Sequence, residues 1–475
     1  MSSSSQTSPD TASPVLEHSS DEMRTPATGS KMSWLIVLVA FALSWALYAY
    51  LPFEEMPRKG LALLFFVAVL WLTEAVHVTF TALIVPIAAA WMGFPEVNTS
   101  KAFASFADPI IFLFFGGFAL ATALHVQKLD RKIAFWIMSL TGAHLGMATL
   151  MLCVVTAILS MWISNTATAA MMLPLALGII GHMDMKTERN TMAFVLLGIA
   201  YSSSIGGLGT LVGSPPNAIA AKAMGIGFGE WLKIGLPMML IMMPLMVLSM
   251  WLVFRPKLNQ RIELPKEDIP WNSSRILTMA VFFVTALAWI FGDKVKGVLG
   301  ITSPDTWIAV AAAVVIGLLN LASWRQIADN TDWGVLFLFG GGITLSNVMR
   351  SSGASQVLGD WVASLLATAS PFAVIFGVAT FIVLLTEFTS NTASAALLVP
   401  VFAAIAERMG MPPNILILVI GIGASFAFML PVATPPNAIV YGTGKILQRD
   451  MVKAGAVLNA VSIVVLAVWA YVFWR

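Results

Sequence analysis

The sequence is short of three kinds of residue on which soluble proteins and enzymes depend. Of its 475 residues only 11% are charged, and Cys153 is the one cysteine. A lone cysteine excludes an intrachain disulfide and a cysteine metal cluster. The five histidines are scattered and no two lie at ligand spacing, which argues against a bound transition metal. A formal net charge of +2, with no basic patch, argues against nucleic acid as a partner.

Apolar residues take the place of the missing charges. Hydrophobic residues make up 58% of the chain, and the mean hydropathy is +0.86. A water-soluble domain cannot cover such a core with so few charged groups. The composition therefore indicates a protein that lies in a lipid bilayer. No nucleophile–base pair or metal cluster is visible in the sequence, so an enzyme is not expected.

The chain divides into a polar tail and one long apolar body. Residues 1–32 are rich in Ser, Thr and Pro and have no apolar periodicity, so we expect a disordered tail and no cleaved signal peptide. The body predicts an all-α polytopic membrane protein with about 11 transmembrane helices, since each span is near the length that crosses a bilayer. The predicted spans are 34–51, 60–76, 78–94, 109–127, 191–221, 231–254, 276–292, 305–322, 333–350, 414–441 and 453–474.

Two further apolar stretches, about 147–180 and 371–406, do not fit as simple spans. Each has a polar Ser-Asn-Thr segment near its middle, and each half is too short to cross the bilayer as a helix. One interpretation is a long kinked helix. We favour a re-entrant hairpin with the polar segment at its tip, because non-helical backbone at that depth has to be buried in protein or to line a cavity.

An internal repeat relates the two halves of the body. Three blocks recur in the same order at offsets of 225, 226 and 220 residues: Phe112–Gly117 with Phe337–Gly342, Ser164–Ala170 with Ser390–Ala396, and Pro215–Ile219 with Pro435–Ile439. Chance does not produce such an arrangement, so the body is a duplicated unit. The sequence predicts a leading transmembrane helix at 33–54, a first repeat at 55–255, a cytoplasmic linker loop at 256–274 and a second repeat at 275–475.

The two repeats are predicted to have opposite orientations in the membrane. If the hairpins do not cross, an odd number of crossings separates each element from its counterpart, as in the inverted repeats of secondary transporters. With the N-terminus in the cytoplasm, most Lys and Arg residues then lie inside, the polar loop from Arg255 to Arg275 above all. Together with the lack of a transit peptide, this favours a bacterial-type inner membrane.

Oxygen-bearing side chains dominate the polar segments. The residues are Ser160, Ser164, Asn165, Thr166, Thr386, Ser390, Asn391 and Thr392. Hydroxyl, amide and carbonyl oxygens hold sodium, while the N-termini of broken helices present N–H groups to anions. The Pro-Pro-Asn segments break their helices too, because proline frees carbonyls in the preceding turn. The sequence thus predicts, in each half, a cation site beside an anion site.

No Lys or Arg lies in any of these motifs. A bound anion is therefore expected to depend on co-bound sodium and on helix-end dipoles, because an uncompensated charge in a low-dielectric site costs several kcal/mol. We accordingly expect sodium to bind before the anion.

Four acidic residues and the Phe-Gly blocks need separate interpretations. Asp108 and Asp332 precede apolar helices and are predicted N-caps. Glu74 and Glu387 lie within apolar segments, where acidic groups are functional candidates. Glu74 lies near a helix end and is also explained as a cap or anchor, and Glu387 as a support for the second hairpin. We interpret the Phe-Gly blocks as sites of close helix packing.

The motifs resemble those of the divalent anion:sodium symporter family, the INDY-like carriers. The resemblance rests on the two Ser-Asn-Thr segments, the two Pro-Pro-Asn segments and the run Ala424–Val440, and it covers about residues 33–475. It implies a homodimer with a fixed scaffold and a moving transport domain, that is, an elevator-type transporter. It also implies sodium-driven uptake of C4 dicarboxylates such as succinate, malate and fumarate, with citrate or sulfate in some members and no organic cofactor.

The resemblance also implies residue roles. The sodium ligands would be Ser160, Ser164, Asn165 and the Gly213 carbonyl in the first half, and Thr386, Thr389, Asn391 and the Ala433 carbonyl in the second. The substrate-binding residues would be Ser164, Asn165, Thr166, Ser214, Pro215, Ser390, Asn391, Thr392, Thr434 and Pro435. Two positions depart from the family pattern. Ser214 replaces a common Thr and bears on substrate preference, and His77 replaces a common Pro and is expected to affect scaffold packing more than transport.

Four alternatives stay open or are disfavoured by particular features. A sodium-independent dicarboxylate exchanger, or a sulfate or citrate carrier of the same fold, keeps the anion contacts. The exchanger should lack the oxygen-rich cation sites, which both halves retain here. A proton-coupled antiporter needs a buried titratable group in the moving core, and only Glu387 offers one. A channel does not need two occluding hairpins.

Overall fold

The computed structural model describes residues 31–474, apart from 95–96, 140–143, 182, 186, 263–267 and 367. The predicted tail therefore lies outside the described residues except for its last two, which begin the first helix. Part of the predicted linker loop at 256–274 also lies outside them. Helices account for the regular structure, and the described residues contain no β-strand, as the sequence predicts.

The helices follow the predicted order. The leading helix and the first half contain α1 (Lys31–Tyr50), α2 (Glu55–Thr73), α3 (Val78–Trp91), α4 (Thr99–Ala104), η1 (Ser105–Ala107), α5 (Pro109–Val126), α6 (Leu129–Ser139), α7 (Leu145–Ser160), α8 (Asn165–Ile180), α9 (Arg189–Gly206), η2 (Gly207–Gly209), α10 (Pro215–Met224) and α11 (Phe228–Phe254). The second half contains α12 (Ser273–Ile290), α13 (Gly292–Leu299), α14 (Pro304–Leu318), α15 (Trp324–Asp329), α16 (Trp333–Ser351), α17 (Ala354–Leu365), α18 (Pro371–Leu385), α19 (Asn391–Arg408), α20 (Pro413–Gly423), α21 (Pro435–Tyr441) and α22 (Gln448–Phe473).

The structure confirms a polytopic all-α protein. A helix lies within every predicted span, and two of these spans are broken, between α9 and α10 and between α20 and α21. Seven helical segments in the described part of the chain are long and apolar enough to cross a bilayer. The other predicted spans contain shorter apolar helices, so the number of crossings stays a prediction. Sequence reasoning did not predict the short helices α4, α6, α13, α15 and α17.

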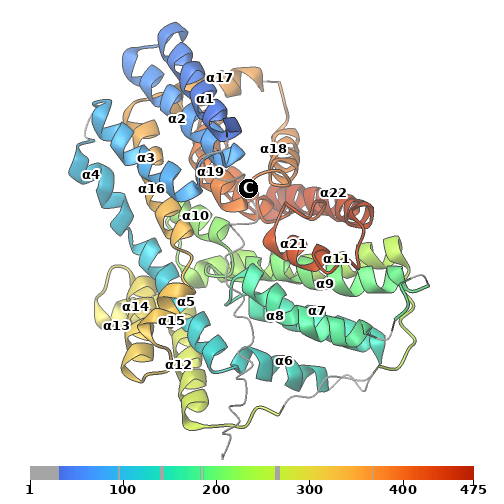
Figure 1. Cartoon of the computed structure of the whole chain (residues 1–475). Coiled ribbons are helices and arrows are strands. Elements are labelled where there is room, and N and C mark those ends of the chain that lie inside the picture. Colours follow the sequence, from blue (N-terminus) through green and yellow to red (C-terminus); the bar gives the residue numbers. More distant parts are fainter. Residues whose placement is uncertain are drawn as a thin grey trace, which may run out of the picture.

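The two stretches with Ser-Asn-Thr segments fold back on themselves. Helices α7 and α8 pack against each other and both contact α9, and α18 and α19 both contact α20 (Figure 1). The connections between the paired helices run through 161–164 and 386–390, where the polar segments lie. A single kinked helix is therefore excluded, and each polar segment forms the tip of a helical hairpin.

The Phe-Gly blocks are sites of close helix packing between the halves. A side chain at Gly116 would place its Cβ 2.4 Å from the backbone oxygen of Ala309, so α5 and α14 meet at their backbones. Likewise a Cβ at Gly341 would lie 2.8 Å from the Cα of Ala82, where α16 meets α3. The first half thus contributes α5 to one contact and α3 to the other. This reciprocal packing is what a two-fold relation between the repeats produces.

The helices sort into two groups in space. One group contains α1–α5 and α12–α16, and the other contains α7–α11 and α18–α22. Of the first group, α4 and α12–α15 lie on the left of Figure 1, and of the second group, α9, α11 and α22 lie on the right. Helices α6 and α17 follow α5 and α16 and lead from the first group to the hairpins of the second. The Lys222 Nζ–Asp108 Oδ2 ion pair, at 2.6 Å, joins α10 of one group to the start of α5 in the other. The cavity described below lies where the groups meet.

Candidate functional site

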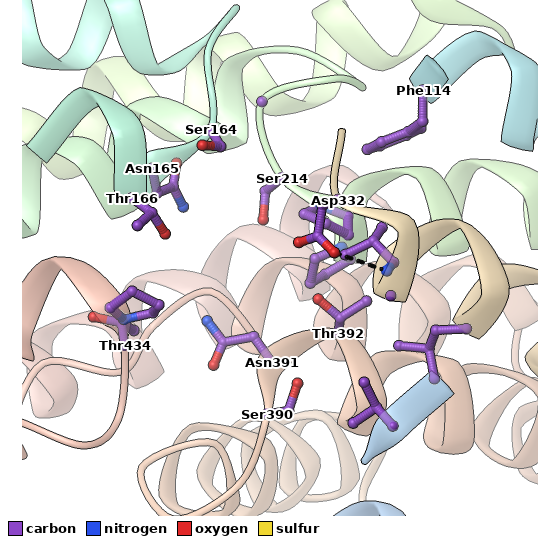
Figure 2. Close-up of a pocket in the computed structure, with 18 of the residues that line it drawn as sticks. Phe114, Ser164, Asn165, Thr166, Ser214, Asp332, Ser390, Asn391, Thr392 and Thr434 are labelled. Carbon is purple, nitrogen blue, oxygen red and sulfur yellow. Dashed lines mark hydrogen bonds between the residues drawn. The ribbon is translucent and has the colours of Figure 1, made fainter. Parts of the chain in front are cut away.

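A cavity of about 170 Å³ brings both hairpin tips and both Pro-Pro-Asn segments together (Figure 2). Twelve of the predicted site residues line it, and they come from four separate segments: Ser164, Asn165, Thr166, Gly213, Ser214, Pro215, Ser390, Asn391, Thr392, Ala433, Thr434 and Pro435. Figure 2 shows Ser164–Thr166, at the start of α8, and Ser390–Thr392, at the start of α19, facing each other across this space. Residues more than 200 positions apart in the sequence therefore share one site.

Four helices begin at the cavity. Ser164 is the N-cap of α8 and Ser390 the N-cap of α19, and their hydroxyls accept backbone hydrogen bonds at 3.3 Å and 3.4 Å. Ser214 and Thr434 precede α10 and α21, each of which starts with two prolines. Proline is well suited to a first turn because the N–H that it lacks has no partner there. The N-terminal ends of four helix dipoles, each about half a positive charge, thus surround the cavity.

The first hairpin tip gathers more oxygen atoms than protons. The Ser160 hydroxyl lies 2.6 Å from Asn165 Oδ1 and 2.7 Å from the backbone oxygen of Ser203. A hydroxyl carries one proton, so at least one of these two acceptors is left without it. Next to them the chain passes closely at Gly213, where an added Cβ would lie 2.6 Å from the Gly207 oxygen and 2.9 Å from the Ser160 oxygen. Hydroxyl, amide and carbonyl oxygens of this kind are the donors that could hold a sodium ion.

The second hairpin tip repeats this arrangement. The Thr386 hydroxyl lies 2.6 Å from Asn391 Oδ1 and 2.9 Å from the backbone oxygen of Ala424. Thr386 corresponds to Ser160 and Asn391 to Asn165 at the offset of 226. Ser160 and Thr386 do not line the cavity themselves; they lie just behind the two asparagines and are fully buried.

Thr389 is a predicted sodium ligand whose hydroxyl is engaged by other protein atoms. Its hydroxyl contacts the Leu385 oxygen at 2.9 Å and the Ser394 hydroxyl at 2.8 Å, inside the hairpin. It does not line the cavity. Of the Thr386 and Thr389 hydroxyls, that of Thr386 is therefore the better placed to bind a cation together with Asn391 Oδ1.

Sequence reasoning missed the role of the asparagine in each Pro-Pro-Asn segment. Asn217 Nδ2 donates to the oxygens of Gly207 and Thr210, at 2.8 Å and 2.7 Å. Asn437 Nδ2 donates to the equivalent oxygens of Ala427 and Leu430, at 3.2 Å and 3.0 Å. Each side-chain amide therefore stabilises the unwound backbone between two helices by donating hydrogen bonds to its carbonyl oxygens. The recurrence of this Asn in both segments could have indicated the role, because the carbonyl groups at a break in a helix need another hydrogen-bond donor.

Glu387, which was expected to support the second hairpin, holds the break between α20 and α21. Its carboxylate accepts hydrogen bonds from the backbone N–H groups of Phe428, Met429 and Leu430, at 2.7, 2.9 and 3.1 Å. Asn459 Nδ2 donates a fourth, at 2.7 Å. The side chain is 1% exposed and does not line the cavity. It holds the loop that leads to Ala433.

The opposite wall of the cavity comes from the other group of helices. Glu74 ends α2 in a left-handed conformation, with φ 49°, and His77 is the N-cap of α3. Asp332 caps α16, as predicted, by accepting from the Val335 N–H at 3.1 Å. Phe114 of α5 completes this wall (Figure 2). His77 was expected to affect packing, and the structure places it at the cavity as well. Asp108 caps α5, also as predicted.

No Lys or Arg is among the described residues that line the cavity. The site offers hydroxyls, amides, carbonyl oxygens and helix N-termini, with Glu74, His77 and Asp332 on the facing wall.

Sequence comparison places these motifs in a known context. The profile of the sodium:sulfate symporter transmembrane region matches residues 30–475. The chain belongs to this family. The match spans both repeats and therefore includes all four cavity-lining segments, which confirms the resemblance that the sequence motifs indicate.

Individual relatives cover most of the chain. An uncharacterized transporter of Haemophilus influenzae is 54% identical over 453 residues, with 94% of this chain and 98% of the relative aligned. An uncharacterized transporter of Methanocaldococcus jannaschii is 35% identical, with 87% and 94% aligned. A sodium-dependent dicarboxylate transporter, SdcS, of Staphylococcus saprophyticus is 32% identical, with 88% and 87% aligned.

The fold also resembles a solved structure, that of the YdaH transporter of Alcanivorax borkumensis. The TM-score is 0.53 at 14% identity, with 93% of this chain and 98% of that chain covered. This likeness concerns the fold alone. The family and its relatives point to a membrane transporter and away from an enzyme.

Proposed function

We propose that this protein is a sodium-coupled symporter of small divalent anions, most of all the C4 dicarboxylates succinate, malate and fumarate. The observation that carries the proposal is the cavity formed by both hairpin tips. Four helix N-termini surround it, and its described lining residues include no Lys or Arg. A dicarboxylate there meets about two positive charges of helix dipole. Bound sodium supplies the remaining compensation.

Sodium fits behind each hairpin tip. In the first half the ligands are Ser160, Ser164, Asn165 and the Gly213 carbonyl. In the second they are Thr386, Asn391 and the Ala433 carbonyl, with Thr389 as the remaining predicted member. Each asparagine lies between a cation site and the cavity, so one side chain serves both ligands. This arrangement gives coupling a physical basis, because the anion completes its binding site only when sodium has fixed the amide.

The substrate carboxylates then contact the hairpin tips and the starts of the broken helices. The proposed contacts are Ser164, Asn165, Thr166, Ser214, Pro215, Ser390, Asn391, Thr392, Thr434 and Pro435. A cavity of about 170 Å³ suits a small dianion. The dicarboxylate specificity of the SdcS relative supports this substrate class, and sulfate or citrate is the second candidate because the family description names sulfate.

The two groups of helices suit an elevator mechanism. The group with α7–α11 and α18–α22 carries the hairpins and would move as the transport domain, and the group with α1–α5 and α12–α16 would stay as the scaffold. The scaffold would also hold the homodimer in the inner membrane, with the N-terminus and the 256–274 loop in the cytoplasm. The predicted boundaries at 33–54, 55–255 and 275–475 define the leading helix and the two inverted repeats.

Uptake into proteoliposomes tests the proposal. Labelled succinate should accumulate when an inward sodium gradient is imposed, and it should not accumulate when choline replaces sodium. Accumulation that requires internal dicarboxylate but no sodium would instead identify an exchanger. If only labelled sulfate or citrate accumulates with sodium, the substrate assignment is wrong and the coupling stands.

A further inference from the structure

A second cavity lies at the far end of α16 from the hairpin tips. It has a volume of about 340 Å³ and is bounded by Val97, by α4 and by the C-terminal part of α16. Two cationic side chains, Lys101 and Arg350, line it, and no acidic residue is among its described lining. The other polar lining residues are Ser105, Thr344, Asn347 and Ser351.

Both cations are available to a ligand. Among the described residues, the Lys101 ammonium and the Arg350 guanidinium form no ion pair and no side-chain hydrogen bond; the bond that Lys101 does make is from its backbone N–H to Asn98. The two positive charges at this cavity repel each other. An oxyanion bound between them attracts both and offsets this repulsion.

The walls of this cavity are rigid. The Thr344 hydroxyl lies 2.9 Å from the backbone oxygen of Ala102, so α16 is bonded to α4 at the cavity. An added Cβ at Gly340 would lie 2.5 Å from the Phe106 ring, which shows how closely η1 packs on α16. Phe106 also contacts Phe337, with ring centroids 6.0 Å apart. The two cations are therefore attached to elements whose relative positions are fixed.

The equivalent corner of the other repeat has no such pair. At the offset of 225, Lys101 corresponds to Gln326 and Arg350 to His125. Gln326 is engaged in a capping box with Ser323, and His125 Nδ1 lies 2.8 Å from Asp130. Gln326 and His125 thus have partners within the protein, whereas Lys101 and Arg350, at the equivalent positions, line a cavity.

The position of the cavity indicates which oxyanion it takes. Lys101 lies in the first turn of the apolar segment Thr99–Val126, and Arg350 lies in the last turn of α16. The ends of apolar segments lie at the depth of the lipid phosphates. Arg presents a fork that binds phosphate through two N–H groups, and Lys adds a point charge.

We propose that this cavity binds the phosphate of an anionic phospholipid headgroup, which Arg350 contacts in a bidentate manner and Lys101 neutralises. Ser105 and Asn347 supply further donors. A headgroup with its own ammonium, such as phosphatidylcholine, would bring a third positive charge to the two cations and bind less well. The bound lipid bridges α4 and α16 and stabilises the proposed scaffold. This site is separate from the transport cavity and does not depend on the proposed function.

Thermal unfolding of the purified full chain in detergent tests this proposal. Phosphatidylglycerol, phosphatidylcholine and inorganic phosphate at constant ionic strength serve as the three probes. Phosphatidylglycerol should raise the midpoint more than phosphatidylcholine does. The double variant Lys101→Gln with Arg350→Gln should lose this difference, with at least about a tenfold loss of apparent lipid affinity. Arg325→Gln, at the equivalent corner on α15, should behave as wild type.

Three results would overturn the proposal. One is an equal response of the wild type to both lipids. Another is a double variant that keeps the full phosphatidylglycerol response. The third is a response to inorganic phosphate alone, which would exclude lipid as the occupant. If the double variant does not fold, Lys101→Gln alone decides the question, because that side chain is exposed and its loss leaves α4 intact.

Discussion

The two halves of the chain build the same hairpin tip but hold the neighbouring broken helix in different ways. In the first half a neutral hydroxyl does this: Thr210 donates to the backbone oxygen of Met161 and accepts from the Gly213 N–H at 3.1 Å. In the second half, the positions of Met161 and Thr210 are occupied by Glu387 and Leu430. A buried carboxylate that accepts three backbone N–H groups replaces the hydroxyl.

The hydroxyl–asparagine pair at the hairpin tip is the same in both halves, whereas the group that holds the neighbouring backbone differs. The pairs Ser160–Asn165 and Thr386–Asn391 are duplicated with the same 2.6 Å contact. The support behind them is not duplicated, so it is free to differ in charge. A carboxylate near the second tip strengthens cation binding there, because charges interact more strongly in a low-dielectric interior. Of the two proposed sodium sites, we therefore expect the second to bind the ion more tightly.

Removing a duplicated asparagine should have the largest effect. Asn165→Ala and Asn391→Ala each delete an oxygen proposed to serve both sodium and substrate, so initial sodium-driven succinate uptake should fall by about 100-fold. Uptake into proteoliposomes measures this. Thr380→Ala is the control, since this hydroxyl lies on α18 away from the cavity and donates to the Phe376 oxygen in the preceding turn. Near-normal uptake in either asparagine variant would remove the proposed site.

Substitutions of Glu387 and Thr210, which hold the backbone next to the two hairpin tips, should have unequal effects on stability and sodium binding. Glu387→Gln replaces an acceptor of four hydrogen bonds with a group that is half donor, so it should destabilise the protein by about 3 kcal/mol and weaken sodium binding. Thr210→Val should cost only about 1–2 kcal/mol. Thermal unfolding at several sodium concentrations measures both quantities. Exposed Glu407 on α19 provides the control Glu407→Gln. Equal losses from Glu387→Gln and Thr210→Val would contradict the asymmetry.

The reciprocal packing contacts should respond alike. Gly116→Ala and Gly341→Ala each force a Cβ against a neighbouring backbone, which should cost about 1–3 kcal/mol in either half. Gly317→Ala on α14, where an added Cβ meets nothing within 4 Å, is the matched control and should be neutral or slightly stabilising. Thermal unfolding compares the three. A large effect in only one half would show that the packing contacts are not equivalent.

The carboxylates on the facing wall should have the smallest effect. Asp332→Asn keeps the N-cap of α16 but removes a charge that attracts sodium to the cavity. The sodium concentration for half-maximal uptake should rise by about threefold, the size of a solvent-screened charge interaction. Asp329→Asn, on exposed α15, is the control. An unchanged sodium dependence in Asp332→Asn would mean that this wall plays no electrostatic part.

Much of the fold was predictable because the membrane limits the choices. The length of the apolar stretches indicates the spans, and the offset between Ser164 and Ser390 indicates the repeat from the sequence alone. The short helices were not predictable. Helices such as α6 and α17 are partly polar and depend on tertiary contacts for their position. Periodicity does not distinguish such segments from loops.

The site was predictable as far as its residues are duplicated. Asn165 and Asn391 stand out because the same polar triplet recurs in apolar surroundings. The cavity wall of Glu74, His77 and Asp332 was not predictable, since these residues have no common motif and meet the hairpins only through packing of the two helix groups. The partners of Glu387 were not predictable either, because three of them are backbone N–H groups, which every residue except proline has.

The most direct test of the account is succinate binding to the purified protein, measured by calorimetric titration in sodium chloride and in choline chloride. The central claim is that sodium at the two hairpin tips creates the anion site. We expect saturable succinate binding in sodium and at least about a hundredfold weaker binding in choline. Equal affinity in the two salts would contradict it, because the cavity would then hold the dianion with helix dipoles alone.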